Sequence, residues 1–131
     1  MADRIIRPVS DEAAIASYLN RKGVALGLPV SGNFELTARC NFDCKMCYVR
    51  LERGEQEKIA PLKKAEDWLQ LAAKAKEAGM LYLLLTGGEP FAYPGFRQLL
   101  EGLHKMGFVV SVNSNGTLID ESNIERIVAA Q

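Results

Sequence analysis

The chain lacks several features that would assign it to common classes of protein. Its 131 residues carry 16 basic and 16 acidic side chains, so the formal net charge is zero and no basic stripe indicates nucleic-acid binding. The longest fully apolar run, from Met80 to Leu85, is far too short to cross a bilayer. Residues 1–8 lack the apolar stretch of a signal peptide. We therefore expect a cytoplasmic protein with neither a membrane nor a nucleic-acid partner.

Cysteine is also scarce, and its placement is the most informative feature of the sequence. The chain has three cysteines, Cys40, Cys44 and Cys47, in the pattern Cys-x3-Cys-x2-Cys. An odd, clustered set argues against a disulfide framework. Three thiolates on one loop can hold one metal centre, and they leave the fourth position of a four-ligand centre open. An open position is typical of a catalytic site rather than of a structural one.

A zinc site is the alternative for these thiolates. The only histidine of the chain, His104, could supply a fourth ligand. It falls beside the apolar face of a predicted helix, where a partly exposed surface position suits it better. Zinc sites also favour paired Cys-x2-Cys units, and the sequence has no second pair. We therefore favour an iron–sulfur cluster.

Hydrophobic periodicity predicts alternating strands and helices. A first helix is predicted over residues 10–21, ended by Gly23, with an irregular lead-in over residues 24–32. Strands are predicted over residues 34–38, 81–85 and 108–112, with helices over residues 61–79, 96–107 and from Asp120 onward. This order predicts an α/β fold with a parallel sheet and right-handed crossovers. We assign residues 1–33 to an N-terminal helical extension and lead-in.

Three polar motifs follow the three predicted strands. The cysteines come after the first strand, Gly87-Gly88-Glu89 after the second, and Asn113-Ser114-Asn115 after the third. The carboxyl ends of parallel strands meet at one edge, so one site built from all three is expected. Taken singly, the glycine motif could be an ordinary strand-ending turn. For Asn115 and the glycine after it, a tight turn is about as plausible as a ligand contact.

Together these motifs resemble those of the radical S-adenosylmethionine (radical SAM) superfamily. The cysteine pattern matches its first motif, and Gly87-Gly88-Glu89 matches its second. The resemblance covers residues 34–131 and implies a radical SAM core of about three βα units, the N-terminal half of a partial (β/α)6 TIM-like barrel. The later motifs of the family, which complete the ribose and adenine pocket, are absent. We therefore expect the chain to be the N-terminal part of a longer enzyme.

The resemblance implies two cofactors, a [4Fe-4S] cluster and S-adenosyl-L-methionine (SAM). Cys40, Cys44 and Cys47 would bind three irons, and SAM would chelate the fourth through its amino and carboxylate groups. Reductive cleavage of SAM would give a 5′-deoxyadenosyl radical that abstracts hydrogen from the substrate. The electron would come from a reductant such as flavodoxin or ferredoxin.

The resemblance also implies roles for residues around the cysteines. Glu89, or the backbone of the Gly-Gly-Glu motif, would pair with the amino group of SAM. Met46 stands where the family often has an aromatic residue and would contact adenine through its backbone, while Tyr48 would supply the aromatic surface. Asn113 and Asn115 would face ribose or substrate.

Three readings concern the function as a whole. The cysteine loop and the Asn-Ser-Asn-Gly-Thr segment look most like the peptide- and protein-modifying, sulfatase-maturase-like SPASM branch, which predicts a peptide or protein substrate. An iron–sulfur binding or electron-transfer module without catalysis is the main alternative. An inert remnant without a cluster is a third.

Overall fold

A computed structural model describes residues 11–49, 51, 55, 58, 61–121 and 123–125. The elements in chain order are α1 (Asp11–Leu26), β1 (Ser31–Glu35), α3 (Ala65–Glu77), β2 (Tyr82–Thr86), the 3-10 helix η1 (Pro90–Ala92), α4 (Phe96–Lys105) and β3 (Val109–Val112). Within these ranges, none of the helices has the length and apolar character needed to cross a membrane.

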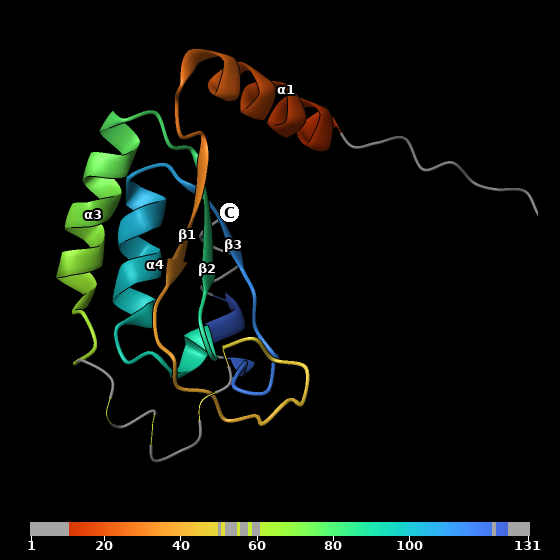
Figure 1. The fold of residues 1–131 in the computed structure, drawn as a ribbon. Helices are drawn as coiled ribbons and strands as arrows, with labels where there is room; N and C mark the ends of the chain where they lie inside the picture. The colour runs from red at the N-terminus through yellow and green to blue at the C-terminus, as the bar shows by residue number, and fades with distance from the viewer. Residues whose placement is uncertain are drawn as a thin grey trace, which may run out of the picture.

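The three strands form one parallel sheet in the order β1-β2-β3. Phe34 is paired with Leu85, and Leu85 with Val112, so the carboxyl ends of all three strands reach the same edge. Helices α3 and α4 cover one face of this sheet (Figure 1). The predicted α/β fold with a parallel sheet is therefore confirmed.

The core lies between the sheet and these two helices. The rings of Phe34 and Trp68 are 4.8 Å apart, which joins β1 to α3. The apolar residues of α4 belong to the same core cluster as Leu83 and Leu85 of β2, which are buried. The buried residues of α4 are Phe96, Leu99, Leu100 and Leu103. This core fixes the orientation of the strands whose ends carry the three motifs.

The helix boundaries that depend on glycine differ between α1 and the later helices. Gly79 (φ +107°) and Gly107 (φ +75°) follow α3 and α4, as predicted. Gly23, however, does not end α1, which continues to Leu26 and is followed by Gly27 at φ +67°. A Cβ at Gly23 would overlap the side chain of Val30, so glycine there allows the chain to return close to the helix.

The first strand also begins earlier than predicted. β1 starts at Ser31, which pairs with Tyr82, and it ends at Glu35 rather than at residue 38. The lead-in over residues 24–32 is therefore helical at its start and extended at its end. The predicted boundary between residues 33 and 34 falls inside β1.

Two helix starts are set by side chains that accept backbone hydrogen bonds. α3 begins at Ala65 rather than near Pro61, because Asp67 accepts from the backbone N–H of Lys64 at 3.1 Å. Asp120 accepts from the N–H of Asn123 at 3.0 Å, which confirms the predicted cap at residue 120. Residues 121 and 123–125 of that helix are helical, whereas residues 122 and 126–131 lie outside the described residues, as does residue 10.

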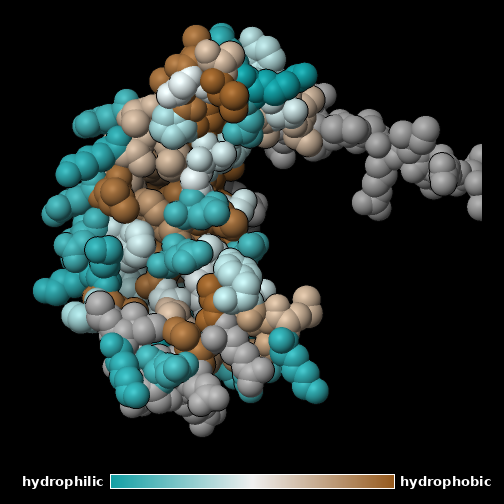
Figure 2. Space-filling model, viewed as in Figure 1, coloured by the Kyte–Doolittle hydropathy of each residue, from teal (hydrophilic) through white to brown (hydrophobic). Residues whose placement is uncertain are grey.

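The surface of the two helical regions differs. Figure 2 shows hydrophilic side chains along the outer side of α3 and hydrophobic ones gathered around the end of α1. Val24 is 83% exposed, and Ile15, Tyr18 and Leu26 are exposed as well. α1 therefore contributes little to the core that positions the strand ends.

Candidate metal and cofactor site

The loops that follow the three strands are joined by hydrogen bonds at one edge of the sheet. Gly88 N–H donates to Thr37 O at 2.6 Å, which ties the β2 loop to the β1 loop. Asn115 Nδ2 donates to Asn41 Oδ1 at 2.9 Å, which ties the β3 loop to the cysteine loop. The structure thus brings together the three motifs that the sequence placed after separate strands.

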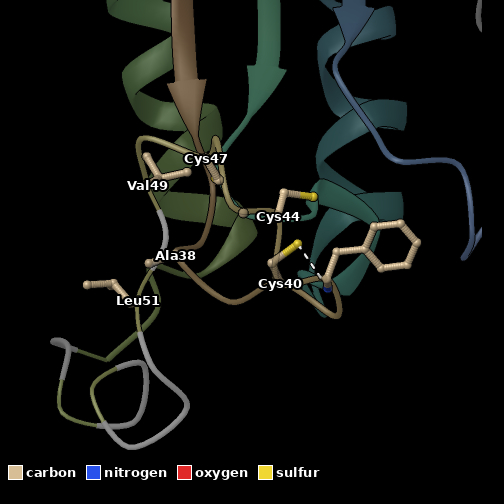
Figure 3. A pocket seen from close by; sticks show the side chains of 8 residues that line it. Ala38, Cys40, Cys44, Cys47, Val49 and Leu51 are labelled. Carbon is tan, nitrogen blue, oxygen red and sulfur yellow. Dashed lines mark hydrogen bonds between the residues drawn. The ribbon is translucent and has the colours of Figure 1, made fainter.

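The three cysteines line one small hollow that is open to solvent (Figure 3). Cys44 and Cys47 are exposed and Cys40 is partly buried. A turn holds the loop, with Cys47 N–H donating to Cys44 O at 3.0 Å. The residues lining the hollow are Ala38, Cys40, Phe42, Cys44, Cys47, Val49, Leu51 and Gly88.

Three thiols on one loop are a donor set that suits an iron–sulfur cluster. Each cysteine of an iron–sulfur cluster binds a different iron, so the sulfurs surround the cluster instead of meeting at one point. Three thiols that share one hollow meet that requirement.

The position of His104 argues further against a zinc site. His104 is exposed in the last turn of α4. α4 starts beside the carboxyl end of β2 and runs back toward the opposite edge of the sheet (Figure 1). The histidine therefore lies at the edge away from the cysteines and does not complete their ligand set.

Apolar side chains around the cysteines were not singled out from the sequence. Ala38, Phe42, Val49 and Leu51 line the hollow with the thiols. An apolar shell limits water near a metal centre and influences its redox potential. The signal for them was only their proximity to the cysteines in the chain.

Two residues predicted to contact SAM lie outside the hollow. Met46 is 94% exposed and Tyr48 is 85% exposed, and neither lines the hollow. The structure therefore gives no support to an aromatic surface at Tyr48.

The two glycines after β2 are required by the neighbouring backbone. A Cβ at Gly87 would overlap Thr37 O, and one at Gly88 would overlap Arg39 O. Gly87 also has φ +138°, a conformation that side chains disfavour. The sequence suggested that these glycines make room for a ligand, whereas here they allow close packing against the segment leading to Cys40.

The carboxylate of Glu89 is buried and accepts hydrogen bonds from two loops. The residue is 0% exposed. Oε1 accepts from Phe91 N–H at 3.0 Å and from Ser114 Oγ at 2.8 Å, and Oε2 accepts from Asn115 N–H at 2.8 Å. The side chain is used in this way, and the N–H groups of Gly88 and Glu89 donate to Thr37 O and Arg39 O, so the motif could meet a cofactor only through its backbone carbonyls.

The asparagines after β3 fall into two environments. Asn113 N–H donates to Leu85 O at 3.0 Å, which extends the pairing of β3 with β2, and its side chain is exposed. Asn115 belongs to a side-chain network with Asn41 and Thr117 beside Cys40. Sequence reasoning placed both near ribose or substrate and missed Asn41 and Thr117.

A tyrosine fixes the segment that follows Glu89. The hydroxyl of Tyr93, directly after η1, donates to Lys63 O at 2.7 Å. Burial raises the pKa of Tyr93, and the nearby carboxylates of Glu66 and Asp67 raise it further. The Gly-Gly-Glu loop is thus anchored to the start of α3 as well as to the cysteine loop.

Residues 34–131 match the Radical SAM superfamily. The chain belongs to this superfamily. Its cofactors are a [4Fe-4S] cluster and SAM, which agrees with the three cysteines on one loop and with the Gly-Gly-Glu motif at the same edge.

Similar proteins act on different classes of substrate. A Thermoplasmatales archaeon "S-adenosylmethionine-dependent nucleotide dehydratase" is 32% identical over 97 residues, which are 74% of this chain and 33% of that protein. "PqqA peptide cyclase" of Granulibacter bethesdensis is 31% identical over 96 residues, 73% of this chain and 25% of that protein. This chain therefore spans about a third or less of the length of these relatives.

A solved structure agrees with the fold. Streptococcus suis SuiB bound to S-adenosylmethionine aligns with a TM-score of 0.65 and 26% identity, over 88% of this chain and 28% of that one. The strand and helix arrangement described above is therefore that of part of a radical SAM enzyme.

Proposed function

We propose that this chain forms the cluster-binding part of a radical SAM enzyme that acts on a peptide or protein. The observation that carries the proposal is the shared hollow of Cys40, Cys44 and Cys47 at the carboxyl edge of the sheet. When bound there, a reduced [4Fe-4S] cluster supplies the electron that cleaves SAM to methionine and a 5′-deoxyadenosyl radical, the group that abstracts hydrogen.

The chain's own residues would bind and orient these cofactors. Cys40, Cys44 and Cys47 would ligate three irons, and the backbone of residues 87–89 would contact the amino group of SAM. The carboxylate of Glu89 would hold the β2 and β3 loops in register, as its three hydrogen bonds indicate. Phe42, Val49 and Leu51 would limit water at the cluster.

The substrate class is supported by the likeness to PqqA peptide cyclase and by the Cys-Asn-Phe-Asp-Cys-Lys-Met-Cys-Tyr loop of this chain. The likeness to a nucleotide dehydratase indicates a nucleotide as the competing class of substrate. We propose a cytoplasmic reductant such as flavodoxin or ferredoxin as the electron donor.

Anaerobic reconstitution with iron and sulfide, followed by EPR of the reduced protein, tests the proposal. We expect close to four irons per chain and a signal that changes when SAM is added. Cys44→Ala should remove the signal, and His104→Ala should leave it unchanged because His104 lies at the other edge. A chain that binds no cluster would overturn the proposal, and a cluster indifferent to SAM would favour an electron-transfer module.

A further inference from the structure

The side chain of Asn115 lies against the cysteine loop in a defined orientation. Its Oδ1 accepts from Thr117 N–H at 3.0 Å and from Thr117 Oγ1 at 2.6 Å. These two donors fix the oxygen on one side, so the amide nitrogen is directed to the other. On that side Nδ2 lies 2.9 Å from Asn41 Oδ1 and 3.9 Å from Cys40 Sγ.

The backbone that carries this amide is held by a buried group. Asn115 N–H donates to Glu89 Oε2 at 2.8 Å, and Ser114 Oγ donates to Oε1 of the same carboxylate. Hydrogen bonds to a charged acceptor are stronger than those between neutral groups. Although Asn115 is itself exposed, the loop is therefore fixed relative to β2 and to the cysteine loop.

The sulfur of Cys40 receives hydrogen-bond donors from two separate segments. Phe42 N–H donates to it at 3.4 Å from within the cysteine loop (Figure 3), and the Asn115 amide approaches it from the β3 loop. Donors to a cluster sulfur stabilise the more negatively charged, reduced state. They therefore raise the reduction potential, which hydrogen bonds to the sulfurs help to set.

We infer that Asn115 is a positioning residue for the metal centre, whose side-chain amide donates to the Cys40 sulfur and raises the reduction potential of the cluster. The inference rests on the proposed function and deepens it. It also replaces the earlier expectation that Asn115 contacts ribose or substrate, because its amide is already directed to Asn41 and Cys40.

The potential of the reconstituted cluster tests this role. Asn115→Ser is the main variant, since a serine hydroxyl can still accept from Thr117 N–H but is too short to reach Cys40. Ser114→Ala is the matched control, because it removes the hydroxyl bonds to Glu89 Oε1 and Gly116 N–H, while the Asn115 N–H bond to Glu89 Oε2 still holds the amide against Cys40. Asn115→Ala is a second variant that removes the amide without adding a hydroxyl.

EPR-monitored redox titration without SAM should give lower potentials for both Asn115 variants. We expect a change of up to about tenfold in the reduction equilibrium, and tenfold corresponds to 59 mV for a one-electron couple. Ser114→Ala should give the same reduction potential as the wild type. Iron content and Trp68 fluorescence would show that each variant keeps its cluster and fold.

Three outcomes would overturn the inference. The Asn115 variants could titrate with the wild type, or Ser114→Ala could shift as far as they do. Weakened SAM binding with an unchanged SAM-free potential would make Asn115 a cofactor ligand instead. Each of these leaves the proposed function standing if the wild-type cluster assembles and responds to SAM, whereas a wild type without a cluster would overturn both.

Discussion

At the scale of single residues, the contacts of Glu89 restrict which side chain can occupy its position. Both of its carboxylate oxygens accept from a backbone N–H, that of Phe91 on Oε1 and that of Asn115 on Oε2. A backbone N–H cannot turn round to accept a hydrogen bond. A glutamine at this position would therefore place its NH2 group against a donor in either orientation.

We expect Glu89→Gln to lower the free energy of unfolding by about 1–3 kcal/mol, the cost of leaving a buried donor unsatisfied. Denaturant unfolding followed by the fluorescence of Trp68, the only tryptophan, measures it. Glu77→Gln, at the exposed end of α3, is the control and should unfold like the wild type. Equal stability of the two variants would show that the buried carboxylate is not the clamp between the loops.

Gly88 is the second residue at which we expect a substitution to lower stability. A Cβ added at Gly88 would overlap Arg39 O and lie 2.9 Å from Ala38 O. Both oxygens belong to the backbone of the segment leading to Cys40. Gly88→Ala should cost about 1–3 kcal/mol of stability, as overpacking does. It should also reduce iron retention after reconstitution, because the cysteine loop must shift.

Gly102→Ala is the matched control for that change. The three atoms nearest to its Cβ would all belong to the side chain of Leu69, which can move, and alanine is preferred to glycine within a helix. We expect it to keep both stability and iron content. If Gly88→Ala also kept both, the glycine would serve a ligand rather than the packing of the two loops.

At the scale of secondary-structure elements, Tyr93 links η1 to the start of α3. Its pKa is raised by burial, so the folded protein holds the phenolic proton more tightly than the unfolded chain. This stabilisation is fully present below the unfolded pKa of about 10 and is lost as pH rises through the higher folded value. The free energy of unfolding should therefore fall more steeply above pH 10 in the wild type than in Tyr93→Phe.

Tyr93→Phe should also cost about 1 kcal/mol at neutral pH, because it removes the hydrogen bond to Lys63 O. Denaturant unfolding at a series of pH values measures both effects. Tyr18→Phe, on the exposed side of α1, is the control. If the free energy of unfolding fell equally with pH in Tyr93→Phe and in the wild type, the fall above pH 10 would not come from Tyr93.

The elements also show what the sequence could predict and what it could not. The strands and the edge they share follow from apolar runs, so the meeting of Cys40, Gly88 and the β3 loop was predictable. The end of α1 was not, because Gly23 is accommodated by a contact with Val30 that exists only after the chain turns. The helix propensity of glycine alone therefore could not show that the helix continues past Gly23.

The roles of the site residues were also hard to predict, because they depend on contacts between residues far apart in the sequence. Asn115 and Cys40 are 75 residues apart, and no local pattern indicates that one donates to the other. The motif around Glu89 suggested a ligand for SAM, whereas its burial and its bonds to Ser114 and Asn115 depend on where β3 ends. Motifs thus predicted the location of the site but not the division of roles within it.

At the scale of the whole molecule, stability should be distributed unevenly. α4 buries four apolar side chains, while Ile15, Tyr18, Val24 and Leu26 of α1 are exposed. Local opening is easiest where few apolar contacts are broken. Hydrogen exchange followed by mass spectrometry should therefore find faster exchange in α1 than in α4, and equal protection of the two helices would contradict this.

Cluster assembly should then change exchange only where the loops meet. A ligand that binds the folded state stabilises it, and the gain is largest in segments that must be ordered to form the site. The loops after β1, β2 and β3 are joined through Gly88, Glu89 and Asn115, so exchange should slow in residues 37–49, 87–89 and 113–117. α1 should be unaffected, and Cys44→Ala treated with iron and sulfide should show no slowing. Slowing confined to residues 37–49 would mean that the cysteine loop binds the cluster independently of the other two strand ends.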